Sequence, residues 1–418
     1  MSRLGDVAEV RGRVGWKGYT VEDLTEDGPL VLGANDITSD NRLSLADVKH
    51  LTREKYEESP EIFVELNDVL VVKVGSTIGK VCIIDDEIGE ASINPNCVIV
   101  RAKNINPYYL YYFLCTPTGR AFLINNSVAS GQPALNQTNL KKLEIPEMDQ
   151  IEQEKIIGVL NAIKKCIVIN EKIIETSEKL MREIYDYWFV QFDFPDENGR
   201  PYKSSGGEMV YNETLKREIP KEWRVQNLLK NDLCKDIKPG IDKFDGTKTY
   251  YATADVINGE MNVGAQIDYD KRESRANMQP KPNSVWFAKM KNSVKHITVM
   301  PTSDDLIKNS VFSTGFFGLR CEPETLPYIR GFIYSDYFEK VKDLNSNGAT
   351  MEAISNDGVK NVKLIIPDSA TLKKYSDVTS VCLSQNDTLR KENAKLISLR
   401  DWLLPMLMNG QVKIIKNG

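Results

Sequence analysis

The sequence contains an internal duplication, which constrains the architecture of the chain more than any other feature. Segment 140–146, an alternating strand pattern closed by Pro146, returns at 359–367 after an offset of about 219 residues, far longer than the period of solenoid repeats. Further segments match in the same order at nearly the same offset: 34–37 with 253–256, 67–73 with 283–289, 97–101 with 316–320 and 107–113 with 327–333. These matches predict that the chain carries one structural unit twice.

Each unit is predicted to hold a mixed globular part of roughly 150 residues, rich in short strands, followed by a long helix. The first helix has a heptad seam whose members alternate in spacing between four and three residues: Ile156, Leu160, Ile163, Ile167, Asn170 and Ile174, continuing to Trp188. The second helix keeps this alternation less purely, through Leu389, Leu396 and Leu403. Asn170 is a polar seam residue of the kind that fixes the register of coiled coils.

The fold class predicted from these patterns is α+β: two similar mixed α/β globular domains, each followed by a long helix, the two helices pairing as an antiparallel coiled coil. The antiparallel direction follows from the pseudo-twofold axis that would relate two similar halves. The stretch from Ile156 to Trp188 would span about 48 Å, so the helices would act as a spacer. The alternative is that each helix packs only on its own globular part.

The predicted boundaries divide the chain into five segments. Residues 1–147 form the first globular domain, 148–190 the first helical spacer, 218–368 the second globular domain and 369–414 the second helical spacer. Residues 191–217 are rich in proline, glycine and serine and are expected to be a connector.

The composition argues against several classes of function. Hydrophobic residues make up 41% and charged residues 27%, as is typical of a globular chain, and no run approaches the ~18 apolar residues of a membrane span. The first residues form no signal sequence, which indicates the cytoplasm. The seven cysteines are dispersed and only two histidines occur, so we expect reduced thiols rather than disulfides or a metal site.

Catalytic motifs are not found. The segment from Gly75 to Lys80 is one residue short of a phosphate-binding P-loop and is followed by Val81 where that motif needs Ser or Thr. Segment 94–97 is only partly similar to an amino-methyltransferase motif, and no glycine-rich cofactor loop precedes it. We therefore expect no cofactor in this chain and no catalysis by it.

Polar and basic loops suited to DNA are present in both units, although the net charge is −5, because phosphate contacts need only a basic face. Hydroxyl and amide side chains can bond phosphates or base edges, and glycines let the backbone approach closely. A plain glycine hairpin is the alternative for 75–80. The candidates in the first unit are Arg11, Arg13, Lys17, Lys73, Gly75, Ser76, Thr77, Lys80, Ser130, Gln132 and Asn136. Those in the second unit are Lys238, Lys243, Lys289, Lys291, Asn292, Ser293, Lys295, His296, Asn347 and Thr350.

The chain resembles type I restriction–modification specificity subunits along nearly its whole length. The segments that carry the resemblance are 140–146, 152–160, 187–193, 219–223 and 403–414. The resemblance departs from symmetry at two places: Glu152-Gln153 has no clear counterpart after Pro367, and the first unit lacks the Pro-x-x-Trp entry at 220–223. These departures bear on the symmetry of partner docking.

The resemblance implies that the globular domains are target recognition domains, each reading one half of a bipartite site on double-stranded DNA. It implies that the helices set the spacing and dock two methyltransferase subunits, and that restriction subunits join for cleavage. S-adenosylmethionine, ATP and Mg²⁺ are implied on those partners. Two other classes stay open: the specificity portion of a divergent or fused DNA methyltransferase or restriction enzyme, and a coiled-coil scaffold unrelated to DNA.

Overall fold

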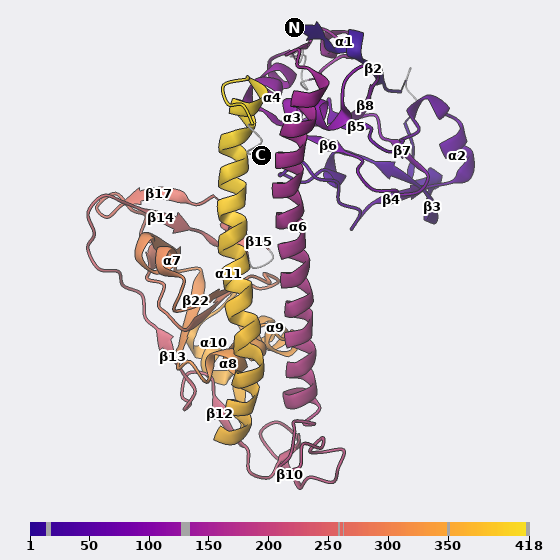
Figure 1. Cartoon of the computed structure of the whole chain (residues 1–418). Coiled ribbons are helices and arrows are strands. Elements are labelled where there is room, and N and C mark those ends of the chain that lie inside the picture. Colours follow the sequence, from indigo (N-terminus) through magenta and orange to yellow (C-terminus); the bar gives the residue numbers. More distant parts are fainter. Residues whose placement is uncertain (14–17, 127–133, 258–259, 262, 349–351, 415–418) are drawn as a thin grey trace. The chain divides into compact units, whose positions relative to one another are not determined.

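The structure is a computed structural model of the chain, and it describes all residues except 14–17, 127–133, 258–259, 262, 349–351 and 415–418. The chain divides into two compact units (Figure 1). Unit 1 is Met1–Ile167 with Ala394–Gly418, and unit 2 is Val168–Asn393. This division falls inside both long helices and therefore differs from the predicted boundaries, since each unit includes the parts of both helices that pack on its globular part.

Unit 1 contains two sheets, a four-stranded one in the order β2-β8-β5-β6 and a three-stranded one in the order β4-β3-β7. Alternate residues of β5 face opposite sides of the first sheet. Val69 and Val71 join the core that contains helix α3, whereas Leu70 and Val72 join the core beneath the second sheet. The elements of this unit are α1 (Leu4–Val7), β2 (Ala8–Arg11), β3 (Leu24–Leu32), β4 (Lys49–Leu51), α2 (Arg53–Glu57), β5 (Val69–Val72), β6 (Val81–Ile83), β7 (Ala91–Ile93), β8 (Cys97–Ala102), α3 (Pro107–Cys115) and α4 (Pro117–Asn125).

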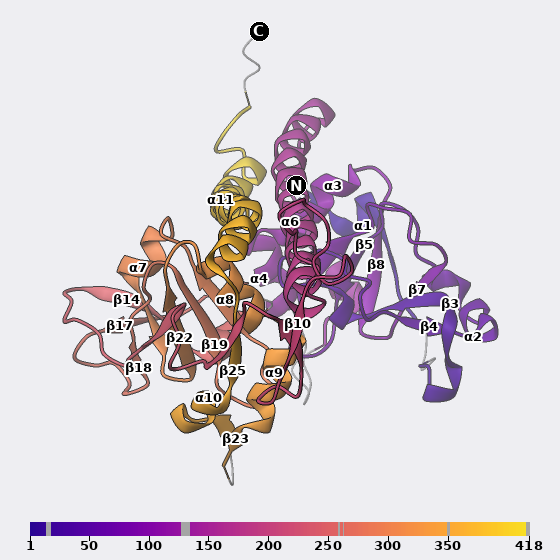
Figure 2. The same ribbon diagram turned by 90° about the horizontal axis from the view of Figure 1, so that it is seen from below.

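Unit 2 repeats this arrangement (Figure 2). Its sheets have the orders β13-β22-β19-β20 and β17-β14-β21-β18, which match unit 1 strand for strand except for the added β18. The topology confirms the duplication that the sequence predicted. The elements are β13 (Cys234–Ile237), β14 (Thr247–Tyr251), β15 (Val256–Ile257), β16 (Glu260–Met261), β17 (Ala265–Asp268), β18 (Ala276–Met278), β19 (Ser284–Ala288), β20 (His296–Val299), α7 (Asp304–Asn309), β21 (Ser310–Ser313), β22 (Phe316–Cys321), α8 (Leu326–Ile333), α9 (Asp336–Leu344), β23 (Ser346–Asn347) and β24 (Ala353–Ile354).

The repeated segment 140–146 is shorter as a strand than predicted. Asn136 caps a short helix, α5 (Gln137–Leu140), by accepting a hydrogen bond from the Asn139 amide at 2.7 Å. Only Glu144–Ile145 form a strand, β9, which pairs with β1 (Ser2–Arg3). In unit 2, α10 (Asn356–Asn361) precedes β25 (Lys363–Ile366), which pairs with β12 (Arg224–Asn227). Ser355 caps α10 by accepting a hydrogen bond from the Gly358 amide at 3.1 Å, so a capping side chain stabilises the start of the helix in both units.

The two long helices are α6 (Gln150–Tyr185), continued by a π-helical turn at Asp186–Val190, and α11 (Ser369–Met408). A hairpin of β10 (Met209–Asn212) and β11 (Arg217–Pro220) lies in the connector between α6 and the second globular part. The seam residues proposed for α6 from Ile156 to Ile174 are buried. None of the helices in the described part of the chain has the length and apolar character needed to cross a membrane.

The buried positions in the second half of α11 are not the three leucines predicted for the second seam. Leu389, Leu396 and Leu403 are only half-buried. The buried side chains in this part of the helix are instead Leu383, Asn386, Asn393 and Leu404. Two of these are polar, so a pattern of hydrophobic residues could not identify them.

Candidate nucleic-acid interface

In unit 1, three of the predicted DNA loops leave the four-stranded sheet at one end. Arg11 is the last residue of β2 and Lys73 follows β5, while the strand between them, β8, begins at Cys97. The loop before α5 reaches the same end, because the Leu135 amide donates a hydrogen bond to the Lys73 carbonyl at 2.8 Å. Val74 also forms a β-bridge with Ala134.

Unit 2 repeats this gathering of loops. Lys238 follows β13 and Lys289 follows β19, on either side of the start of β22. The Ile354 amide donates a hydrogen bond to the Lys289 carbonyl at 2.9 Å, and Met290 forms a β-bridge with Ala353. Each unit therefore presents polar loops from separate parts of the sequence at the corresponding end of its sheet.

The hairpin 73–80 is shaped by two glycines. Gly75 and Gly79 have φ of 91° and 86°, in a region that side chains rarely adopt. Gly79 lies against α4, where an added Cβ would be 3.4 Å from Ile124. Ser76 is exposed at the tip and Thr77 is half-buried, so this hairpin can offer hydroxyl groups to a phosphate or a base edge.

The corresponding hairpin in unit 2 is held by a buried cluster of charged groups instead. Lys342 of α9 is fully buried, and its Nζ donates to the Ser293 carbonyl at 2.9 Å and to Glu339 Oε2 at 2.5 Å. Glu339 Oε1 lies 2.9 Å from His296 Nε2. Burial raises the pKa of Glu339, but the hydrogen bonds with His296 and Lys342 outweigh burial and hold this pKa below its ordinary value.

Several candidate side chains are engaged within the chain. Arg13 is 8% exposed and donates to the Ile93 carbonyl at 3.3 Å, and His296 is buried against the Tyr334 ring. Ion pairs join Arg11 to Glu9, Lys238 to Asp236 and Lys291 to Glu352.

Two further candidate lysines form hydrogen bonds with backbone carbonyls of their own unit. Lys80 Nζ donates to the Ile37 carbonyl at 2.8 Å, and Lys295 Nζ donates to the Thr253 carbonyl at 2.6 Å. Lys80 and Lys295 stand directly before the equivalent strands β6 and β20. In each unit, one lysine thus joins the hairpin to the short 3₁₀ turn that follows β3 or β14.

Four further described candidates lie toward solvent. Lys243, Asn136 and Asn347 are exposed, and Asn136 also caps α5. Asn292 is exposed with φ of 57°, and its amide donates to Asp343 Oδ1 at 3.1 Å. Lys17, Ser130, Gln132 and Thr350 lie outside the described residues.

The amino-terminal part of the chain matches a known family of domains. Residues 1–179 match the type I restriction modification DNA specificity domain. This part of the chain is similar to that family of DNA specificity domains. The match confirms the resemblance to type I restriction–modification specificity subunits that the sequence segments carried.

Known specificity subunits are similar to this chain over most of its length. The type I restriction enzyme MjaIX specificity subunit of Methanocaldococcus jannaschii is 26% identical over 76% of this chain and 71% of its own length. The HindI specificity subunit of Haemophilus influenzae is 18% identical over 95% of this chain and 99% of its own length. A crystal structure of the type I system S subunit from M. genitalium has a TM-score of 0.57 and 15% identity, covering 97% of this chain and 94% of that one. That structural likeness concerns the fold.

A partly buried ionic cluster in unit 2 joins the second globular part to both long helices. Glu178 of α6 accepts hydrogen bonds from Arg330 of α8, from Arg390 Nη2 at 3.1 Å and from Asn386 Nδ2 at 3.2 Å, the last two on α11. Burial raises the pKa of Glu178, but the charges of Arg330 and Arg390 and their hydrogen bonds lower it below its ordinary value. Sequence reasoning missed this cluster, because Glu178 and Arg330 are 152 residues apart.

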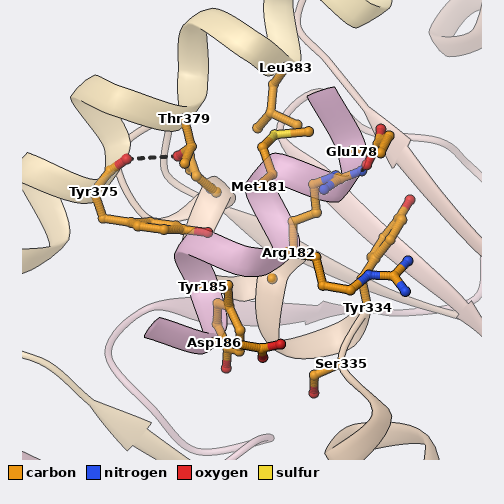
Figure 3. A pocket seen from close by; sticks show the side chains of 13 residues that line it. Glu178, Met181, Arg182, Tyr185, Asp186, Tyr334, Ser335, Tyr375, Thr379 and Leu383 are labelled. Atoms are coloured by element: carbon orange, nitrogen blue, oxygen red, sulfur yellow. Dashed lines mark hydrogen bonds and ion pairs between the residues drawn. The ribbon is translucent and has the colours of Figure 1, made fainter. Parts of the chain in front are cut away.

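The cavity beside this cluster is too small for a cofactor. It has a volume of about 20 Å³ and is lined by Tyr185, Tyr375 and Thr379, among others (Figure 3). Thr379 Oγ1 turns back to its own helix and donates to the Tyr375 carbonyl at 2.7 Å. Such a volume holds about one water molecule. Across the described residues, no group of three or more His, Cys, Asp or Glu side chains is placed to bind a metal ion.

Proposed function

We propose that this chain is the DNA-reading specificity subunit of a type I restriction–modification complex, with each unit reading one half of a bipartite site. The observation that carries the proposal is the duplicated sheet end. In both units it gathers a hairpin after the central strand and the loop before a short helix, while the side chains in those loops differ. A shared scaffold with different loops suits two readers of different sequences.

We propose further that α6 and α11 pair as an antiparallel coiled coil that sets the distance between the two half-sites. Contacts within the units support this direction. In unit 1, Ile156 and Leu160 near the start of α6 share a core with Leu407 near the end of α11. In unit 2, the end of α6 contacts the start of α11 through the rings of Tyr185 and Tyr375, 6.5 Å apart.

Methyltransferase subunits, two per chain, are proposed to dock on exposed apolar side chains of the long helices. Four such residues on α6 and on the π-helical turn that continues it are spaced four, seven and seven residues apart, which places them on one face outside the buried seam. They are Ile169, Ile173, Leu180 and Tyr187, with exposed fractions between 37% and 54%. Restriction subunits would join this assembly, and S-adenosylmethionine, ATP and Mg²⁺ would be bound by these partners. This chain would supply recognition and no catalysis.

The test is to express the chain with a candidate methyltransferase subunit from the same genome and to map methylated adenines across the host genome. We expect methylation at a motif of two short sequences separated by a fixed gap, and only when this chain is present. Methylation of an ungapped motif, or methylation that persists without the chain, would contradict the proposal. A scaffold unrelated to DNA would instead give no salt-dependent retention of the chain on DNA.

A further inference from the structure

One lysine occupies the same structural position in both units. Lys73 directly follows β5 and Lys289 directly follows β19, the equivalent central strands. The Lys73 amide donates to the Asn96 carbonyl at 2.8 Å, and the Lys289 amide donates to the Gly315 carbonyl at 2.9 Å. Together with the hydrogen bonds that their carbonyls accept from Leu135 and Ile354, these contacts fix both backbones in the same way.

The side chains of these two lysines differ from the other lysines of the same hairpins. Lys80 and Lys295 donate their ammonium protons to backbone carbonyls. Lys73 and Lys289 are half-buried, and within the described part of the chain neither ammonium has a hydrogen bond or an ion pair. Segments 127–133 and 349–351, which lie outside the described residues, contain no Asp or Glu in the sequence.

A half-buried ammonium without a carboxylate is unfavourable in the free protein. Burial lowers the pKa of both Lys73 and Lys289, and no carboxylate acts to raise it. An ammonium group loses favourable contacts with water when it is buried. A neighbouring anion replaces these contacts and stabilises the charged form. The arrangement is therefore completed by a negatively charged ligand at each of the two positions.

We propose that Lys73 and Lys289 each bind a phosphate of the DNA backbone and act as equivalent anchors of the two units. This inference rests on the proposed function and adds to it the kind of contact that each lysine makes. Base contacts are expected to differ between two readers of different sequences, whereas backbone contacts can be shared. The lysine is the same in both units while the hairpin after it changes from Gly75-Ser-Thr-Ile-Gly79 to Lys291-Asn-Ser-Val-Lys295. The presence of lysine at this position in both units therefore indicates a contact that does not depend on the base sequence of the DNA.

The salt dependence of DNA binding tests this proposal. We would measure the affinity of the full chain for a 30-base-pair duplex of arbitrary sequence over a range of salt, for the wild type, Lys73→Gln, Lys289→Gln and the double variant. Each phosphate contact contributes about 1 to the slope of log K against log salt, so the double variant should lose about 2. Lys221→Gln, at an exposed lysine that directly follows β11, is the control and should keep the slope.

Each outcome has a distinct meaning. An unchanged slope in a double variant that melts like the wild type would overturn the phosphate anchors and leave the proposed function standing. A change in affinity for the cognate duplex alone would make the lysines base contacts and would also overturn the assignment. No salt-dependent binding by the wild type would instead contradict the proposed function.

Protection from chemical modification gives a test without substitutions. Trace acetylation of the chain near pH 8, with and without the same duplex, can be read by peptide mass spectrometry. We expect the duplex to protect Lys73 and Lys289 by several-fold and to leave Lys221 unprotected. Equal reactivity of Lys73 and Lys289 with and without bound duplex would contradict the proposal.

Discussion

Asn170 Nδ2 of α6 donates a hydrogen bond to Asn393 Oδ1 of α11 at 2.9 Å, and both side chains are buried. An asparagine in an otherwise apolar seam lowers stability but favours the one register in which it finds a polar partner. This pair joins the two long helices within unit 2 and aligns residues that are 223 positions apart. The polar seam position seen in the sequence thus acquires a specific partner.

Replacing one member of this pair should cost more than replacing both. Asn170→Leu removes the donor from a buried acceptor, so we expect the free energy of unfolding to fall by about 1–3 kcal/mol. The double variant Asn170→Leu/Asn393→Leu should recover part or all of that loss, because two apolar groups leave no mismatch between these positions. Urea unfolding of the wild type, both single variants and the double variant measures the coupling. Strictly additive losses would show that the two residues do not stabilise each other.

The first seam could be predicted because its members are mostly apolar and evenly spaced. The second could not, because Thr379, Asn386 and Asn393 occupy buried positions of α11, where polar side chains interrupt the hydrophobic pattern. Asn386 and Asn393 have partners on α6, Glu178 and Asn170, whereas Thr379 donates to the Tyr375 carbonyl of its own helix. The duplication could be predicted from the matched segments. The gathering of three loops at one end of a sheet could not, because it depends on the strand order, which no local sequence pattern specifies.

The residues of the candidate site could likewise be predicted only in part from the sequence. The sequence identified the lysine-bearing hairpins, but it could not separate Lys73 from Lys80. That separation depends on whether a distant carbonyl, here that of Ile37, comes within hydrogen-bond distance. Lys342 was missed altogether, since a lysine on an amphipathic helix is ordinarily exposed.

Glu178 should make the stability of unit 2 depend on pH. Its pKa in the folded chain is lower than the ordinary value of 4.5, so the stabilisation is present above about pH 4.5 and is lost as the pH falls through the lowered folded pKa. Glu178→Gln removes the charge opposite buried Arg330 and should lower the free energy of unfolding at pH 7 by roughly 3–5 kcal/mol. Urea unfolding at pH 7 and pH 4 checks both points. The variant should lose less stability than the wild type on acidification, and an equal loss would assign the acid sensitivity to other groups.

Lys342→Met should destabilise the hairpin that follows Lys289. The substitution removes the donor to the Ser293 carbonyl and leaves Glu339 without one of its two partners, and we expect a loss of about 1–3 kcal/mol in the free energy of unfolding. In unit 1, buried Leu123 of α4 occupies the corresponding helical position, so Leu123→Met serves as a control that should cost less than about 1.5 kcal/mol. Thermal melting and hydrogen exchange of the hairpin amides provide the measurements. Unchanged exchange at 291–295 in Lys342→Met would exclude this role.

Substitutions in one hairpin should alter recognition of only one half-site. Ser76→Ala/Thr77→Ala removes hydroxyl groups from the unit 1 hairpin, and Asn292→Ala removes an exposed amide from the unit 2 hairpin. Loss of a base contact costs about 1–3 kcal/mol in discrimination at that position. Methylome mapping of each variant should show relaxed sequence preference in one half of the motif and an unchanged other half. Relaxation in both halves by either variant would contradict separate reading by the two units.

Shortening both long helices should shorten the gap between the half-sites. Deleting residues 163–169 from α6 and 394–400 from α11 removes one heptad from each helix, keeps the seam in phase and retains Asn170 and its partner Asn393. Seven residues correspond to about 10.5 Å of helix, or about three base pairs at 3.4 Å per pair. The methylated motif of the shortened chain should therefore keep both half-site sequences and lose about three base pairs of its gap. Deleting the heptad from α6 alone breaks the match between the helices and should abolish methylation. If the doubly shortened chain methylates the original motif with the original gap, the distance between the half-sites is set by something other than these helices.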